Sequence, residues 1–403
     1  MNRLVVQPLI TSSISTVIVI DALDECKDEE PASAILSVLG QFVASLPMVK
    51  FFVTGRPESR IQEGFRLPLL AEATDVFVLH DVEPSQVSND IRLFFRQSFE
   101  ELKGRRPGLD GWPTEEQRDV LCKRAAGLFV YAVATVRFIY QRNTSPKRQL
   151  DRLLQSPESN EFEGKTKFKG DATLDSLYAS ILQEAFGDDD PENDPRVRST
   201  LGAVILAANP LSPSTIAALL CLDVEDVFPL LSSVQSLLIF QVDDLDRPVR
   251  PFHKSFPDFI VDPVRCANPR FRVNTVYQNV ELLVGCLELM NQRLGQNICR
   301  LPDGVTNSEV DDLGERIEKH IDQALQYACR SWHKHLIGTL SAQALDVTPI
   351  LHHFLKKKFL FWLEVLSVLG ATREAVDALD AAGKWLCVCY LSSSVHFQKF
   401  TQV

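Results

Sequence analysis

The chain has 403 residues, a formal net charge of −11 at pH 7, 45% hydrophobic residues and 24% charged residues. This composition is typical of a soluble globular protein, and the negative charge disfavours nonspecific binding to nucleic-acid phosphates. Because no apolar run reaches about 18 residues, we predict no membrane span, and the start has no signal-peptide pattern. The 9 scattered cysteines indicate a reducing compartment, so we expect the cytoplasm.

The first part of the chain alternates strand-like and helix-like patterns. The run VIVI at Val17–Ile20 is typical of a strand buried on both faces of a parallel sheet. Helical spacing follows over Pro31–Ser45, and further strands are predicted at Val49–Val53 and Val76–Leu79. This order predicts right-handed βαβ units.

The next part has helical patterns. Apolar residues recur at helical spacing over Gln86–Glu100, and Thr114 with Gln117 forms a capping-box pattern at the start of another helix. The apolar run Ala125–Tyr140 predicts one buried helix. The polar stretch Gln155–Ala172 is typical of an exposed linker.

A three-helix pattern followed by a hairpin pattern comes after this linker. Helices are predicted at Leu174–Phe186, Val197–Ala208 and Ser212–Leu220, the last with a Ser cap and a Pro at its first position. Leu237–Val242 and Pro248–Phe252 read as the two strands of the hairpin. This order is typical of a winged-helix domain.

The remainder from Val273 is predicted to be all-helical. Apolar faces at a spacing of about 3.6 residues cover Val273–Leu294, Val310–Trp332 and Val347–Leu369. An irregular tail is expected from Cys387 onward.

The segment VIVIDALDEC, Val17–Cys26, carries the sharpest chemical signal. A buried strand ends in Asp21, with Asp24 and Glu25 just after it, and open parallel sheets bind ligands beyond the carboxyl ends of their strands. Asp21 is therefore a candidate for holding Mg²⁺ through water, and Asp24 or Glu25 for orienting the water of a phosphoryl transfer. The alternative is a structural acidic turn or helix start.

The segment FFVTGRPESR, Phe51–Arg60, places Arg56 at the carboxyl end of the neighbouring strand. An arginine there can detect a terminal phosphate, because its planar fork binds phosphate oxygens. The alternative is a surface arginine in a Gly-Pro turn. The two motifs in this order favour the nucleotide interpretation.

These residues resemble the STAND class of P-loop ATPases, in particular the fungal NACHT proteins that often carry WD repeats. The resemblance runs from about Leu4 to Leu386. Further matching segments are Ala125–Tyr140, Leu174–Leu182, Pro251–Ile260 (PFHKSFPDFI), Ala324–Leu336 and Phe359–Gly370. Together the segments are specific, whereas each of them alone is a weak signal.

The resemblance implies a mixed α/β and mainly α fold with a partial P-loop NTPase sheet. The expected parts are residues 1–84 (carboxyl-side part of the NTPase core), 85–154 (helical subdomain), 155–172 (linker), 173–265 (winged helix), 266–386 (helical domain) and 387–403 (irregular tail). It also implies ATP or ADP with Mg²⁺ as cofactors, and protein partners or self-oligomers.

The resemblance also implies roles for single residues. Asp21, Asp24 and Glu25 would be the Walker B acids and Arg56 the sensor. His253 would approach the diphosphate and lock a resting state, although a lone histidine is more often structural. Gly127 matches the adenine-proximal GxP element only in part, because Phe129 stands where Pro is common; Gly127 could instead allow close helix packing.

The phosphate-binding pattern GxxxxGK followed by Ser or Thr does not occur in the sequence, and neither do WD repeats. The chain therefore resembles the middle of a longer protein: we expect a truncated gene model, a degenerate copy or a short product that works with a partner, and no efficient catalysis by this chain alone. An open sheet flank beside Val17–Ile20 predicts poor solubility or dependence on another chain.

Three other functions compete with a nucleotide-gated switch. A catalytically inactive scaffold or protein-interaction module is favoured by the missing phosphate-binding loop. A DNA-reading winged helix is disfavoured, because Ser214–Leu238 contains no Lys or Arg. A metal enzyme would need its ligands among His333, His335, His352 and His353, whose spacing differs from that of a zinc-binding helix; we expect them on the polar faces of helices.

Overall fold

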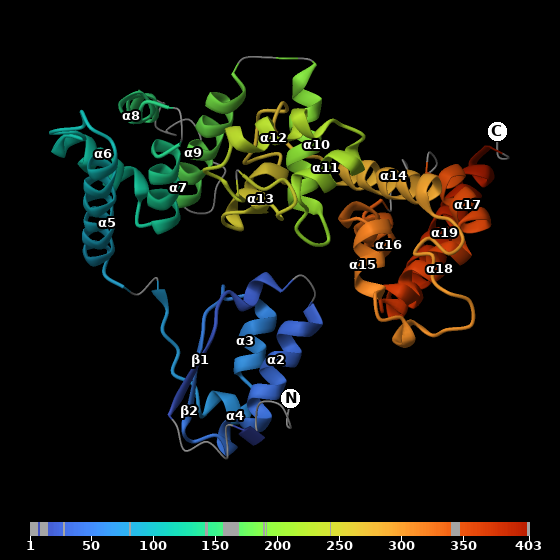
Figure 1. The fold of residues 1–403 in the computed structure, drawn as a ribbon. Helices are drawn as coiled ribbons and strands as arrows, with labels where there is room; N and C mark the ends of the chain where they lie inside the picture. The colour runs from blue at the N-terminus through green and yellow to red at the C-terminus, as the bar shows by residue number, and fades with distance from the viewer. Residues whose placement is uncertain are drawn as a thin grey trace. The chain divides into compact units, whose positions relative to one another are not determined.

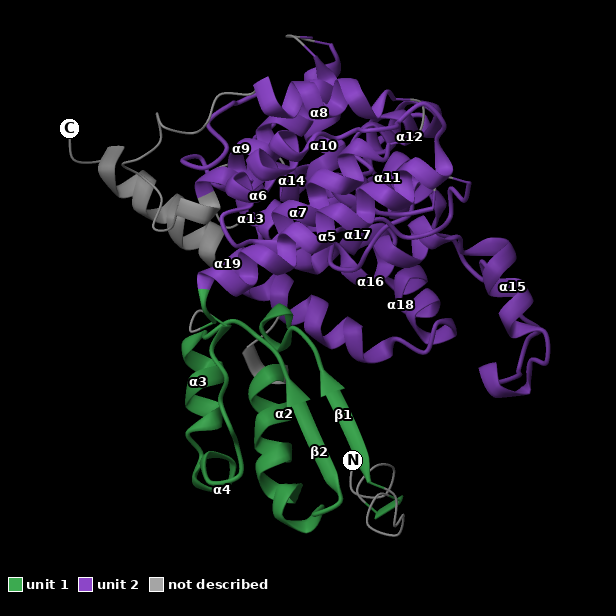
Figure 2. Ribbon diagram, turned by 90° about the vertical axis from the view of Figure 1, so that its left-hand side faces the viewer, with its two compact units in different colours: residues 1–83 green, residues 84–403 purple. Residues whose placement is uncertain are grey.

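The computed structural model describes residues 7–8, 15–26, 29–79, 82–141, 144–155, 169–187, 190, 192–241, 243–339 and 347–400, and the side chains of 29–31, 169–171 and 388–400 are outside the description. The chain forms two compact units, Met1–Glu83 and Pro84–Val403, which Figure 2 shows in different colours.

The first unit contains two parallel strands, β1 (Thr16–Ile20) and β2 (Val49–Val53), joined through helix α2 (Glu29–Phe42). Their register runs from Thr16 opposite Val49 to Ile20 opposite Val53. The remaining elements are the short turns η2 (Leu23–Glu25) and η3 (Val43–Ser45) and the helices α3 (Ser59–Phe65) and α4 (Pro68–Ala71). Figure 1 shows β1 and β2 side by side next to these helices. The predicted parallel βαβ unit is confirmed.

Only one face of this sheet is packed. Its inner face places Ile20, Phe51 and Val53 against a core that includes Leu23 and Leu36. On the outer face, Val17 and Val19 are each 63% exposed and Phe52 is 61% exposed. The prediction that Val17–Ile20 is buried on both faces is therefore wrong. Among the described residues, helices pack against one face of the sheet alone, and a β-branched run does not reveal how many faces are covered.

The predicted third strand at Val76–Leu79 does not form. These residues take no strand pairing, and Val76, Phe77 and Leu79 are each at least 75% exposed. Their composition favours an extended backbone, but strand propensity chiefly reflects packing against neighbours. No described strand lies beside them to supply that packing.

The second unit is mainly helical. It begins with α5 (Pro84–Arg105), α6 (Glu115–Ala125), α7 (Phe129–Ile139) and α8 (Pro146–Gln155). The capping box at Thr114 is confirmed, since its hydroxyl accepts from the Gln117 amide at 3.2 Å and the Gln117 side chain accepts from the Thr114 amide at 3.0 Å.

The apolar run Ala125–Tyr140 is not one helix. Ala126 and Gly127 have φ values of 47° and 81°, and two consecutive left-handed residues cannot continue a right-handed helix. The chain therefore ends α6 at Ala125 and restarts α7 at Phe129. Hydrophobic periodicity could not reveal this break, because both flanking helices bury apolar residues.

The middle of the second unit combines helices with a short hairpin. Its helices are α9 (Lys169–Phe186), α10 (Asn193–Leu206), α11 (Pro213–Leu220), α12 (Val224–Ser233) and α13 (Ser255–Val261). The hairpin pairs β3 (Leu238–Ile239) with β4 (Arg250–Pro251) in antiparallel order. The Ser212 cap of α11 is confirmed by its bond from the Thr215 amide at 3.2 Å. Helix α12 was not predicted, and Val242 lies outside the described residues.

The last part of the unit is helical, as predicted. It contains α14 (Thr275–Arg293), η6 (Asn307–Glu309), α15 (Leu313–His320), α16 (Gln323–Ile337), α17 (Thr348–Lys357), α18 (Phe359–Val368) and α19 (Thr372–Phe400). Trp332, Phe354 and Trp362 form an aromatic cluster with ring centroids 5.4–6.0 Å apart. Each of the three side chains is fully buried.

Two predicted irregular segments need correction. The tail expected from Cys387 continues α19 as far as Phe400. The expected linker Gln155–Ala172 lies largely outside the described residues, but Gln155 ends α8 and Lys169 already begins α9. Polarity alone does not exclude a helix, since one face of a surface helix is polar. In the described part of the chain, no helix is long and apolar enough to cross a membrane.

Candidate functional site

The carboxyl ends of β1 and β2 are joined through Thr54. Its amide donates to the Ile20 carbonyl at 2.9 Å, which extends the parallel ladder past the strand end. The Thr54 hydroxyl donates to Oδ1 of Asp21 and accepts from the Ala22 amide at 2.8 Å. Asp21 itself is exposed. Thr54 therefore fixes the position of an accessible carboxylate at the edge of the sheet.

The turn after Asp21 separates the two remaining acids. Ala22 has φ 53° and ψ 50°, a left-handed conformation that reverses the chain into η2. Leu23 is 2% exposed and anchors this turn in the core, and its amide donates to the Thr54 carbonyl at 2.9 Å. As a result Asp24 is 5% exposed, whereas Glu25 is exposed to solvent.

Asp24 contacts the loop that follows β2. Its Oδ1 accepts from the Arg56 amide at 3.1 Å, and its Oδ2 lies 3.6 Å from Nε of Arg56. The Asp24 carbonyl accepts from Arg60 at 3.1 Å, and Arg60 also pairs with Glu58 at 2.8 Å. The motifs Val17–Cys26 and Phe51–Arg60 thus meet at one edge of the sheet, because their strands pair in parallel.

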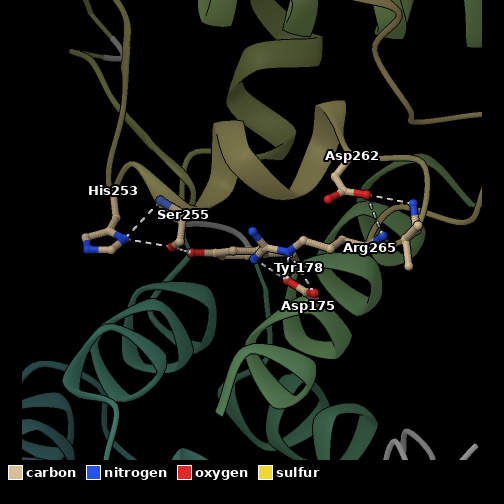
Figure 3. Close-up of polar contacts among 7 residues, drawn as sticks. Asp175, Tyr178, His253, Ser255, Asp262 and Arg265 are labelled. Carbon is tan, nitrogen blue, oxygen red and sulfur yellow. Dashed lines mark hydrogen bonds and ion pairs between the residues drawn. The ribbon is translucent and has the colours of Figure 1, made fainter. Parts of the chain in front are cut away.

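The predicted residue His253 lies in the second unit, between the hairpin and α13. Figure 3 shows its ring pointing toward Ser255. The Ser255 amide donates to Nδ1 of His253 at 3.2 Å, and Oγ of Ser255 lies 2.6 Å from the same nitrogen. Because an amide can only donate, Nδ1 is an acceptor, and the proton of the neutral ring is on Nε2. The donor side of the ring therefore faces away from Ser255.

Tyr178 of α9 completes this chain of contacts. Its hydroxyl lies 2.7 Å from Oγ of Ser255, and burial raises the pKa of Tyr178 to about 12. The phenol is therefore protonated at neutral pH and can donate to Ser255, which in turn donates to His253. In this order the hydroxyls of Tyr178 and Ser255 each donate a hydrogen bond. The buried Tyr178 thereby helps to fix the tautomer of His253.

An ion pair holds the same helix to the segment after α13. Arg265 binds the carboxylate of Asp175 in a forked arrangement, with nitrogen–oxygen distances of 2.7 Å and 3.0 Å. Asp262 caps the turn by accepting from the Val264 amide at 2.7 Å. Figure 3 shows these contacts alongside the His253 chain. Together they fix α9 against the segment that carries His253.

Arg137 is a further residue near this site, and sequence analysis did not identify it. Its guanidinium lies 4.4 Å from the centroid of the Phe252 ring and donates to the carbonyls of Gln235, at 2.9 Å, and Leu238. Burial lowers the pKa of Arg137. It ties α7 to the hairpin beside His253. The sequence signal that could have identified Arg137 is its position as a single arginine inside the apolar run of α7.

Gly127 follows the end of α6, and its positive φ explains the glycine. The position of an added Cβ would have Val87 as its nearest neighbour at 3.9 Å, an ordinary contact. The alternative that Gly127 allows close helix packing therefore lacks support. Phe129, where the related pattern has Pro, is 44% exposed and meets Phe94 edge-on at 6.2 Å.

The two histidine pairs occupy different environments. His333 and His335 are 5% and 1% exposed, so the expectation that they lie on a polar helix face is wrong. His335 bonds Tyr327 at 2.7 Å and Asn279 at 2.9 Å, whereas His352 and His353 are exposed. Across the described residues, no three His, Cys, Asp or Glu side chains are grouped so that they could hold a metal ion.

Comparisons with known proteins give two matches. The family described as "Nephrocystin 3, N-terminal" matches residues 1–56, which include both strands and the acidic turn between them. The vegetative incompatibility protein HET-E-1 of Podospora anserina is 23% identical over 393 residues, covering 90% of this chain. No solved structure matches the chain.

The chain spans about a quarter of the length of that relative, since the match covers 26% of HET-E-1. The two matches confirm the resemblance drawn from the motifs: the chain has a fungal NACHT-type relative.

Proposed function

We propose that this relative of the fungal NACHT-type proteins is part of a nucleotide-gated signalling switch that responds to ATP or ADP with Mg²⁺. The observation that carries the proposal is the meeting of Asp21, Asp24 and Arg56 at the carboxyl edge of one parallel strand pair. This is the edge at which open parallel sheets bind their ligands. The match along 90% of the chain supports a signalling role of this kind.

The residues present fit a magnesium–nucleotide complex in part. Mg²⁺ is usually held by one or two carboxylates together with phosphates and water, and the exposed Asp21 offers one such carboxylate. Bound magnesium would neutralise charge on the phosphates. Glu25 is the accessible acid for orienting a water, and Arg56 is the cation for a terminal phosphate. The sequence contains no GxxxxGK pattern for the phosphates, so we propose no catalytic step for this chain alone.

His253 has the features that a phosphate contact requires. Its Nδ1 accepts from Ser255, so the remaining ring nitrogen is a donor in the neutral form. The second unit would then respond to a diphosphate through this histidine. In this proposal, residues 85–154 form the helical subdomain, 173–265 the winged helix and 266–386 the helical domain, and partners are other proteins or further copies.

A direct binding measurement tests the proposal. The full chain is titrated with fluorescently labelled ADP and Mg²⁺, and binding is followed by anisotropy. We expect Arg56→Ala to weaken binding at least about tenfold, because a charge-assisted phosphate contact is worth about 1.5–3 kcal/mol. Asp21→Asn should weaken binding only when Mg²⁺ is present.

The matched control is Arg66→Ala, since Arg66 is an exposed arginine in the same unit. It should leave the affinity unchanged. If the folded chain binds neither ADP nor ATP, the switch proposal fails for this chain. The inactive scaffold or interaction module then remains as its function.

A further inference from the structure

We infer that Asp24 is a positioning residue that holds the guanidinium of Arg56, and that a phosphate group binds by taking Arg56 away from it. The inference rests on the function proposed above and refines one part of it. It gives Asp24 the role of a competitor for the arginine, in place of a role in orienting water.

The Asp24 carboxylate has little access to solvent. Asp24 is 5% exposed, and its Oδ1 already accepts from the Arg56 amide at 3.1 Å. A Cβ added at Gly55 would lie 3.5 Å from the same oxygen, so the backbone after β2 passes close to the carboxylate. A water-orienting acid needs access to that water. The neighbouring Glu25 has this access, and Asp24 does not.

Two arginines, Arg56 and Arg60, lie beside the same turn. Arg60 makes short bonds, with Nε donating to Glu58 at 2.9 Å and the terminal nitrogen donating to the Asp24 carbonyl at 3.1 Å. The Nε of Arg56 lies 3.6 Å from Oδ2 of Asp24, which is beyond hydrogen-bond range. The Arg56 side chain is 46% exposed, against 21% for Arg60. A phosphate can therefore reach the Arg56 side chain more readily than that of Arg60.

A phosphate is a better partner for the Arg56 guanidinium than Asp24 is. A phosphate offers two oxygens to the planar fork of a guanidinium at true hydrogen-bond distances. The contact between Oδ2 of Asp24 and Nε of the same fork is longer, at 3.6 Å. The bond from the Arg56 amide to Asp24 need not break in this exchange, so the loop keeps its backbone position. Only the guanidinium has to move from the carboxylate to the phosphate.

The experiment titrates the full chain and its variants with pyrophosphate by calorimetry at low ionic strength. Asp24→Asn keeps an oxygen acceptor for the Arg56 amide but removes the competing charge. We expect it to bind pyrophosphate about two to five times more tightly, since partly exposed ion pairs contribute up to about 1 kcal/mol and each factor of ten corresponds to about 1.4 kcal/mol. Asp24→Glu, which restores the charge, should return toward the wild-type affinity.

Arg56→Ala should lose the binding, and Arg66→Ala should leave it unchanged. A second measurement follows the side-chain Nε–H resonance of Arg56 by NMR. This resonance should shift in Asp24→Asn without ligand, and in the wild type when pyrophosphate is added. If Asp24 only supported the fold, the Arg56 resonance would not respond both to Asp24→Asn and to pyrophosphate. Repeating the titration with ADP distinguishes a nucleotide from a free phosphate.

The outcomes separate the two proposals. If the wild type binds and Asp24→Asn binds equally or less tightly, the competition is wrong while the nucleotide function stands. If neither the wild type nor Asp24→Asn binds pyrophosphate or ADP while both are folded, the proposed function fails and the competition fails with it. Binding that is insensitive to Arg56→Ala also overturns the inference.

Discussion

Ala22 occupies a backbone conformation that favours glycine. Its φ of 53° lies in the left-handed region, where a Cβ costs about 1–2 kcal/mol. The conformation is required here because it turns the chain from Asp21 into η2, and that turn separates the exposed Asp21 from the buried Asp24.

We predict that Ala22→Gly raises the free energy of unfolding of the first unit by about 0.5–1 kcal/mol. The strain energy that glycine relieves in the folded state exceeds the free-energy cost of the entropy that it adds to the unfolded chain. Urea denaturation measures the change. Ala34→Gly is the matched control, because Ala34 is exposed within α2 and glycine there should cost about 1 kcal/mol. A loss of stability in both variants would contradict the prediction.

His333 is a buried histidine that resists protonation. Its Nδ1 has no hydrogen-bond partner among the described residues. Burial lowers the pKa of His333, Lys334 lowers it further, and Asp377 and Glu374 act in the opposite direction. The unfolded state therefore binds a proton more readily than the folded state does.

This difference predicts a loss of stability in acid. The contribution of the neutral ring is fully present above the ordinary histidine pKa of about 6.5, and it is lost as the pH falls below that value. His333→Gln cannot titrate, so the free energy of unfolding should fall less between pH 7 and pH 5. The exposed His353→Gln is the control and should keep the wild-type slope. Equal slopes in all three proteins would refute the role of His333.

Helices α11 and α14 approach so closely that one position tolerates only glycine. A Cβ added to Gly285 would lie 1.9 Å from the carbonyl oxygen of Leu219, which is backbone and cannot rotate away. Both helices contribute fully buried side chains to the main core. This contact joins the middle of the second unit to its last part.

We therefore expect Gly285→Ala to destabilise the second unit by about 1–3 kcal/mol, the usual cost of overpacking. Thermal unfolding followed by circular dichroism measures the loss. Gly383→Ala is the control, since Gly383 is exposed in α19 with no atom within 4 Å of an added Cβ. Alanine should be neutral or stabilising there. A neutral effect at Gly285 would show that the helices can separate at little cost.

The two compact units of the molecule are expected to unfold separately. The division falls between Glu83 and Pro84, and each unit has its own buried cluster. A domain with its own core unfolds as a cooperative unit. We predict two transitions in scanning calorimetry of the full chain.

Matched core substitutions assign the transitions. Leu36 in the first unit and Leu282 in the second are both 0% exposed, and Leu→Ala in a core costs about 2–5 kcal/mol. Leu36→Ala should lower one transition temperature and Leu282→Ala the other. A single transition lowered by both variants would show that the units unfold together.

Local patterns in the sequence were sufficient for several features of this protein. The parallel order of Val17–Ile20 and Val49–Val53, the caps at Thr114 and Ser212 and the helical character after Val273 all follow from short-range rules of spacing and capping. The grouping of Asp21, Asp24 and Arg56 at one edge also follows, because parallel strands bring their carboxyl ends together. The roles of these residues in nucleotide binding stay predictions.

Other features depend on contacts between residues far apart in the sequence. The turn at Ala22 and the hydrogen bonds of Thr54 and Arg56 determine that Asp24 is buried while Asp21 is exposed. A strand's own residues do not determine which elements pack beside it. For this reason the sequence did not reveal that Val17 and Val19 are exposed or that Val76–Leu79 is unpaired. Packing between helices likewise buries His333 and His335. It also places Arg137 against the hairpin. Propensity acts over a few residues, whereas burial and pairing depend on the whole fold.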